Sequence, residues 1–182
     1  MKLKFIALIV VAFFVLTSCM KKENAAMVNP PKTSKADSMK TAYIAFITAW
    51  NAAKVDEFDK YIDTNCLENY EPMEGIKTGM AGLKEMSIIL NTACPDIKTT
   101  IKSISVEGNN LNISYKDSGT NTGAVNGLLP TKEPVSGEGN YAVIWQNGKF
   151  HDLSGVMEAG KVLINAIKVM QDYIPKDTIK TK

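Results

Sequence analysis

Residues 115–158 read YKDSGTNTGAVNGLLPTKEPVSGEGNYAVIWQNGKFHDLSGVME, and this stretch decides the fold. A strand is predicted over 139–145, and its apolar side chains at alternate positions share one face: Tyr141, Val143 and Trp145. Asn147-Gly148 follows, a pair that favours a type I′ hairpin turn. A strand over 150–156 is then expected to pair back, so the stretch predicts part of an antiparallel sheet.

The preceding segment extends this sheet. Residues 97–106 are rich in Ile, Val and Thr, and their apolar phase slips between Ile101 and Ile104, which predicts a bulge in a long, curved strand. Gly108-Asn109-Asn110 predicts the next turn. Apolar residues then alternate with polar ones in a further strand: Leu111, Ile113 and Tyr115.

Helical spacing dominates the region before the sheet. Positions i, i+3, i+4 and i+7 are apolar in a first helix that Ser34 or Asp37 can cap: Tyr43, Phe46, Ile47 and Trp50. A shorter helix is expected over 55–62, a short strand or extended segment over 66–70, and a third helix over 80–93. A closing helix is expected over 160–173. Helices separated in this way from a meander of strands indicate an α+β fold, and a bent sheet wrapped around helices forms a cone that contains a pocket.

The N-terminus has the pattern of an export signal. Lys2 and Lys4 precede twelve apolar residues, 5–16, which are too few to span a bilayer comfortably. The ending Leu16-Thr17-Ser18-Cys19 resembles the bacterial lipobox, in which the cysteine is acylated and becomes the new N-terminus. The alternative is a buried cysteine beside a membrane span. We expect a lipid anchor at Cys19 and a location in the bacterial cell envelope.

This cleavage sets the expected domain organisation. A signal peptide covers 1–18, a flexible tether 19–34, the folded domain 35–174 and a polar tail 175–182. Removing the signal leaves 19 basic and 19 acidic residues, and every basic residue is Lys. Because the mature chain is neutral and has no guanidinium groups, nucleic acid is not an expected partner.

The cysteines and the single histidine do not suggest metal chemistry. Cys66, Cys94 and His151 lack the spacing of a metal site, so no metal is expected. In an exported protein the two cysteines could form a disulfide, but two buried free thiols are favoured.

Four short motifs occur in a recognisable order. They are GMAGLKEM at 79–86, CPDI at 94–97, GTNTG at 119–123 with Gly127 and Pro130-Thr131, and NGKF at 147–150. In order and spacing they resemble the SnoaL-like polyketide cyclase family of the NTF2-like superfamily, over roughly residues 45–166. The resemblance implies a cone-shaped α+β barrel, with a curved antiparallel sheet wrapped around the N-terminal helices.

The resemblance also implies a site. Family cyclases use a carboxylate at the end of the last strand as acid and base, without a metal or organic cofactor, and Glu158 takes that position where the family usually has Asp. If the strand continues that far, its period of two places Glu158 in the cone, where an apolar environment would raise the pKa of its carboxyl. The alternative is an exposed residue at the start of the closing helix.

This chain departs from the family at three further positions. Asn121, and by our alignment Asn69, stand where the family commonly has His, and Ser154 stands where it has Trp. Amides bind through hydrogen bonds but do not titrate near neutrality. The expected ligand contacts are therefore Asn69 and Asn121, with Tyr141 and Trp145 as apolar walls.

Two function classes follow. The first is a membrane-anchored domain that binds a small hydrophobic or polycyclic molecule in its cone, with cyclase- or isomerase-type chemistry through Glu158. The second is a non-catalytic envelope lipoprotein that uses the cone as a scaffold for binding or for homodimerisation. A buried Glu158 beside an open cavity favours the first class, and a filled cone or an exposed Glu158 favours the second.

Overall fold

The computed structural model describes residues 33–66, 74–124 and 129–172. The expected signal peptide, most of the tether, Asn69 and the polar tail lie outside these ranges. The elements in chain order are α1 (Lys35–Asn51), the 3-10 helix η1 (Val55–Lys60), α2 (Gly79–Ala93), β1 (Lys98–Glu107), β2 (Asn110–Thr120), β3 (Pro134–Gln146), β4 (Lys149–Asp152) and α3 (Ser154–Asp172). This order confirms the α+β class.

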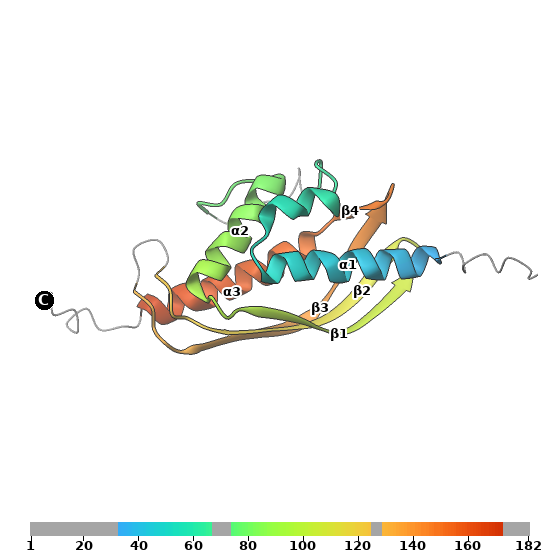
Figure 1. The fold of residues 1–182 in the computed structure, drawn as a ribbon. Coiled ribbons are helices and arrows are strands. Elements are labelled where there is room, and N and C mark those ends of the chain that lie inside the picture. The colour runs from blue at the N-terminus through green and yellow to red at the C-terminus, as the bar shows by residue number, and fades with distance from the viewer. Residues whose placement is uncertain (1–32, 67–73, 125–128, 173–182) are drawn as a thin grey trace, which may run out of the picture. The chain divides into compact units, whose positions relative to one another are not determined.

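The sheet is antiparallel and its strands follow chain order, β1-β2-β3-β4. It is curved and unclosed, and the helices lie on its inner side (Figure 1). α1 packs on β1, α3 on β3 and α2 on α3. We call the space between the helices and the inner face of the sheet the cone.

Two local predictions for the sheet are confirmed. The pairing of β1 with β2 shifts register between Ile101 and Ser103, where the apolar phase slips. Asn147 and Gly148 both have positive φ, 51° and 85°, as a type I′ turn requires. β3 starts earlier than expected, at Pro134.

The strand expected over 150–156 is wrong in its second half, because β4 ends at Asp152 and α3 begins at Ser154. The Asp152 carboxylate accepts a hydrogen bond from the Ser154 backbone N–H at 2.8 Å. The backbone N–H groups of Val156 and Met157 both donate to the Leu153 carbonyl. These bonds satisfy donors of the first helical turn, which explains why the helix starts six residues earlier than predicted.

The shorter helix before α2 also differs from expectation, because its residues form the 3-10 helix η1, which ends at Lys60. After it, Ile62 forms an isolated parallel bridge with Phe150 on β4. The backbone N–H of Phe150 donates to the Tyr61 carbonyl at 2.8 Å. Of the strand expected at 66–70, only Cys66 is described, and it lies in a turn.

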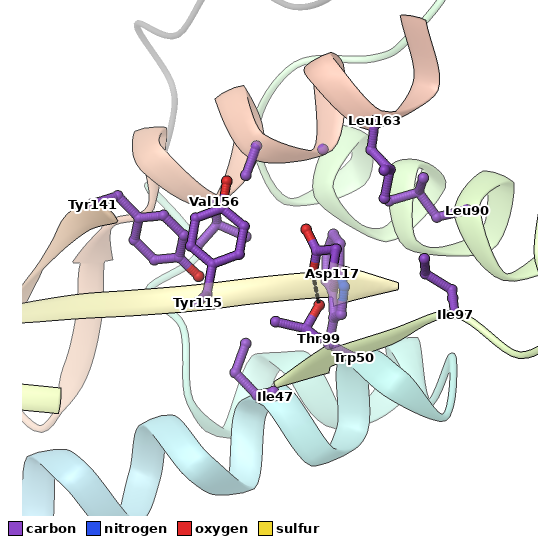
Figure 2. A pocket seen from close by; sticks show the side chains of 12 residues that line it. Ile47, Trp50, Leu90, Ile97, Thr99, Tyr115, Asp117, Tyr141, Val156 and Leu163 are labelled. Carbon is purple, nitrogen blue, oxygen red and sulfur yellow. Dashed lines mark hydrogen bonds between the residues drawn. The ribbon is translucent and has the colours of Figure 1, made fainter. Parts of the chain in front are cut away.

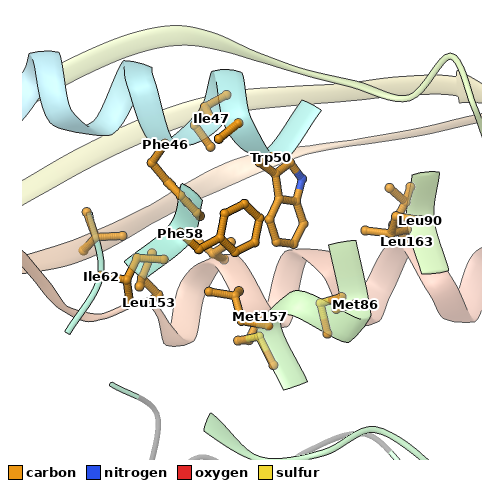
Figure 3. Close-up of a cluster of buried hydrophobic side chains, with 14 of the residues drawn as sticks. Phe46, Ile47, Trp50, Phe58, Ile62, Met86, Leu90, Leu153, Met157 and Leu163 are labelled. Atoms are coloured by element: carbon orange, nitrogen blue, oxygen red, sulfur yellow. The ribbon is translucent and has the colours of Figure 1, made fainter. Parts of the chain in front are cut away.

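Aromatic and aliphatic side chains fill one end of the cone (Figure 3). Trp50 of α1 stacks on Phe58 of η1, with ring centroids 6.0 Å apart and planes 15° from parallel. Phe46 meets Phe58 edge to face, with ring centroids 5.3 Å apart.

Cys66 and Cys94 are buried and free, as predicted, and burial raises the pKa of their thiols to about 12 and about 11. Both thiols are therefore unreactive near neutrality.

Candidate functional site

A pocket lies in the cone where α1, α3 and the sheet meet (Figure 2). Most of its wall is apolar, and the polar exceptions come from the strands. The lining residues are Ile47, Trp50, Leu90, Ile97, Thr99, Tyr115, Asp117, Tyr141, Val156, Ala159, Gly160 and Leu163. The pocket therefore combines an apolar wall with one carboxyl, one threonine hydroxyl and two tyrosines.

Asp117 faces the pocket because of the alternation of β2, where it shares the inner face with Ile113 and Tyr115. It is 7% exposed. Thr99, its direct cross-strand partner on β1, donates its hydroxyl to one carboxyl oxygen at 2.6 Å. The other oxygen has no hydrogen-bond partner among the described residues. Burial raises the pKa of Asp117, and the Thr99 hydrogen bond lowers it by less.

Thr99 is held in place by α1. The Thr99 backbone N–H donates to the Asn51 side-chain oxygen at 2.8 Å, and the Asn51 amide donates to the Thr99 carbonyl at 2.9 Å. Asn51 thus occupies both backbone groups that Thr99 would offer to another strand. This double contact fixes the position of the hydroxyl that binds Asp117.

Three tyrosines lie close to the carboxyl. The hydroxyls of Tyr43 and Tyr141 are 2.5 Å apart, and either can donate. The rings of Tyr115 and Tyr141 lie 4.9 Å apart. Burial is the main cause that raises the pKa of all three phenols, and the Asp117 charge contributes to the rise in each. The tyrosines are therefore neutral hydrogen-bonding groups at physiological pH.

The space left in this pocket is small. Its volume is about 20 Å³, room for about one water molecule. The side chains themselves fill most of this part of the cone.

Glu158 does not lie where the sequence predicted. It is on α3 instead of the last strand, its side chain is 60% exposed, and its carboxylate pairs with Lys161 at 3.2 Å. It does not line the pocket. The alternative expectation, an exposed residue of the closing helix, describes its location. The physical reason is the early start of α3, which replaces the strand alternation with a helical period and turns position 158 outward.

Asn121 is buried, and its side chain forms hydrogen bonds with the surrounding loops. Its amide donates to the Ala93 and Gly123 carbonyls at 3.0 and 3.2 Å. Its oxygen accepts from the Thr131 backbone N–H at 2.8 Å. These contacts join the end of α2 to the segment between β2 and β3, and Asn121 does not line the pocket.

Of the other residues singled out from the sequence, some line the pocket and others do not. Tyr141 lines the pocket, as an expected wall residue should. Trp145 does not, and its ring packs against Phe150 at 4.9 Å. His151 is exposed, 3.9 Å from the Asp63 carboxylate. Asn69 lies outside the described residues.

Asp117 is the site residue that the sequence interpretation missed. The signal was available, since Ile113, Tyr115 and Asp117 continue the alternation of Leu111. An apolar pattern alone does not select Asp117, because its side chain is the polar member of the alternation.

The described ranges contain no cluster of three or more His, Cys, Asp or Glu residues that could hold a metal ion. None of their helices is long and apolar enough to cross a membrane.

The chain belongs to the SnoaL-like polyketide cyclase family, because the model of that family matches residues 40–159. No curated protein sequence matches this chain.

Solved structures support the same fold. The chain is similar to a SnoaL-like polyketide cyclase from Agrobacterium tumefaciens, with a TM-score of 0.51 and 17% identity over 63% of this chain and 86% of that chain. It is similar to TsrD from Streptomyces laurentii, with a TM-score of 0.54 and 18% identity over 63% and 84% of the two chains. A SnoaL-like protein from Jannaschia has a TM-score of 0.54 and 14% identity, over 72% and 96%. At these identities the likeness establishes the fold alone.

Proposed function

We propose that this protein is a lipid-anchored SnoaL-like domain that binds a small, mainly apolar molecule in its cone and carries out cofactor-independent acid–base chemistry with Asp117. The observation that supports this most is a carboxyl that is 7% exposed in an apolar pocket. A buried acid without a cationic partner costs stability, so its presence is more typical of a functional site than of a structural one.

The chemistry follows from the environment of this carboxyl. Burial raises the pKa of Asp117, which increases the protonated fraction near neutrality and makes the ionised form a stronger base. The carboxylate can take a proton from a carbon beside a ligand carbonyl and return it at another position. Tyr141 can donate to the oxygen that becomes negative. The net result is an isomerisation or a ring closure, with no electrons gained or lost.

This proposal transfers the acid–base role from Glu158 to Asp117. Glu158 is 60% exposed, pairs with Lys161 and does not line the pocket, so it is not placed to exchange a proton with a ligand there. Tyr141 remains the proposed wall residue, because it lines the same pocket as Asp117.

The proton-transfer role predicts a clear difference between two variants. Asp117→Asn keeps the shape and a hydrogen-bonding group but cannot transfer a proton, so turnover should fall at least about 100-fold with little change in ligand affinity. Glu158→Gln is the matched control and should retain turnover. The substrate can be sought by native mass spectrometry of molecules that co-purify with the full chain. Equal turnover in wild type and Asp117→Asn would remove Asp117 from the mechanism.

The anchor is proposed on the sequence of residues 1–19 alone. We expect the mature chain to begin at Cys19 and to carry acyl groups that hold the domain in the cell envelope. Mass spectrometry of the N-terminal peptide from membranes should find this lipidated cysteine, and Cys19→Ser should leave an uncleaved, unacylated precursor. An unmodified peptide that continues upstream of Cys19 would contradict the anchor.

A second candidate function is the non-catalytic scaffold, in which the cone supports binding of a partner or of a second copy. The observations that favour it are the 20 Å³ volume of the pocket and the exposure of Glu158. Under this function no small molecule should co-purify, and Asp117→Asn should change stability alone.

A further inference from the structure

A second hollow adjoins the Asp117 pocket at Thr99, which lines both. It is a groove of about 440 Å³ between α1 and β1, within the usual range of small-molecule sites. We call it the α1–β1 groove, and its lining residues are Ile44, Ile47, Thr48, Asn51, Thr99, Ile101, Lys102, Ser103 and Ile104. Ile44 is 51% exposed, so the groove offers an apolar surface that ligands can reach from solvent.

The groove and the Asp117 pocket share two lining residues, Ile47 and Thr99. Figure 2 shows Ile47 on α1 and Thr99 on β1 on the same side of Asp117, with the Thr99 hydroxyl joined to the carboxyl. The open groove and the pocket of the buried acid therefore adjoin at these two side chains, which we call the partition.

The two residues of the partition differ in how firmly they are held. Thr99 is fixed by Asn51 through both of its backbone groups and by Asp117 through its hydroxyl. Ile47 is held by packing alone, and a change of its rotamer needs no hydrogen bond to break. To open the partition and keep the Thr99–Asp117 contact, the Ile47 side chain, which is 5% exposed, has to move.

We propose that the α1–β1 groove is the ligand's binding surface and its route to Asp117. This inference rests on the proposed function and deepens it by naming the ligand class: an uncharged, mainly apolar molecule with a hydrogen-bond-accepting oxygen at one end. The apolar body lies on Ile44, Ile101 and Ile104, and the oxygen passes Ile47 to meet the carboxyl.

The volumes of the inner pocket and of the groove support this placement of the ligand. A space of about 20 Å³ beside Asp117 is about the size of one water molecule and admits only the oxygen-bearing end of a ligand, whereas the groove has room for the rest of a small molecule. A ligand that occupied the inner pocket alone would have to displace the core.

The charged residues of the two hollows indicate that the ligand is uncharged. No Lys or His lines the inner pocket, so a ligand anion there would be buried without a counter-ion. Lys102 in the groove is already engaged by the Glu138 carboxylate at 2.6 Å. An uncharged oxygen, by contrast, can accept a hydrogen bond from protonated Asp117.

The neutral aromatic ketone 6-propionyl-2-dimethylaminonaphthalene is a suitable probe, because its fluorescence reports binding to an apolar site. Ile44→Lys places a charge in the groove and should weaken binding by about tenfold. Ile88→Lys is the matched control, because Ile88 is 49% exposed on α2 and does not line the groove. It should bind within about twofold of wild type. Equal affinities of the two variants would overturn the groove as the binding surface.

The pH dependence of ketone binding tests whether a ligand in the α1–β1 groove reaches Asp117. Protonated Asp117 donates to the ketone and its carboxylate does not, so wild-type affinity should fall by about fivefold as pH rises through the pKa of Asp117. Asp117→Asn should show no such fall.

The titratable groups packed near Asp117 are Tyr43 on α1, Tyr115 on β2 and Tyr141 on β3, while α2 and α3 contribute apolar lining residues. The phenols do not titrate in this range because their pKa values are raised.

The outcomes separate the two proposals. If Asp117→Asn abolishes turnover while Ile44→Lys and Ile88→Lys bind alike, the proposed function stands and the groove is overturned. If Ile44→Lys loses binding but wild type and Asp117→Asn have the same pH profile, the groove is not connected to Asp117, and this inference fails.

Discussion

The two acids of interest, Asp117 and Glu158, differ in environment more than in chemistry. Asp117 is on an inward position of β2 with one hydrogen bond from Thr99. Glu158 is on the outer surface of α3 beside Lys161. Because a buried carboxyl has its ionised form disfavoured and an exposed one does not, the first is the candidate for proton transfer.

The burial of Asp117 predicts an unusual pH dependence of stability. Burial raises the pKa of its carboxyl in the folded state, so the folded state holds this proton more tightly than the unfolded state does. The stabilisation is fully present below the unfolded-state pKa, about 3.9, and is lost as pH rises through the folded-state pKa.

Urea unfolding of wild type and Asp117→Asn at pH 4 and pH 7 measures this effect. The free energy of unfolding of the variant, relative to wild type, should be higher at pH 7 than at pH 4 by on the order of 1 kcal/mol. Groups with lowered pKa values, such as Asp96 and Glu138, affect both proteins equally and cancel in the comparison. A relative stability that is independent of pH would contradict the burial of an ionisable carboxyl.

At the scale of elements, α3 determines the shape of the pocket. It provides Val156, Ala159, Gly160 and Leu163 to the lining and approaches β3 closely at Gly155. A Cβ atom built on Gly155 would lie 2.4 Å from the Tyr141 Cβ. The absence of a side chain at 155 therefore allows the helix to sit on Tyr141.

This close approach predicts that Gly155→Ala forces α3 and Tyr141 apart. The free energy of unfolding should fall by about 1–3 kcal/mol, as denaturant unfolding can measure. Gly137→Ala on β3 is the control, because its nearest neighbour would be the Leu163 Cδ1 at 4.0 Å, and it should be close to neutral. A similar loss in both variants would mean that Gly155 has no special packing role.

The elements with one clear period were predicted from sequence, including α1, α2, the bulge in β1 and the turn at Asn147-Gly148. The start of α3 was not, because residues 150–158 fit two periods. Phe150 and Val156 are compatible with alternation, whereas Leu153, Val156 and Met157 are spaced for a helix and are buried. The choice depended on the cap at Asp152 and on the space at Gly155, which are tertiary features.

The site was less predictable than the fold for the same reason. Tyr141 was expected to line the cone and does, because a strand's period fixes its side. Glu158 was placed on the last strand by a resemblance to the family, but in this structure it lies on α3. Asn121 replaces the family's expected His, and its amide is engaged by neighbouring loops, which no spacing rule reveals.

At the scale of the whole molecule, two hollows of different size meet at Ile47 and Thr99. The core fills the inner end of the cone and leaves about 20 Å³ beside Asp117, and the α1–β1 groove provides the larger surface outside. Such a division would let a domain of the SnoaL-like family keep a dry, preorganised acid while a ligand's body remains near solvent.

The central claim is that Asp117 is a buried acid whose carboxyl has a raised pKa in the folded protein. A ¹³C NMR titration of the aspartate carboxyls in the folded chain, assigned by comparison with Asp117→Asn, tests this most directly. The account predicts that the Asp117 signal titrates at a pKa above that of ordinary exposed aspartates, and that it remains protonated after they have ionised. An Asp117 signal that titrates together with them, or below them, would contradict it.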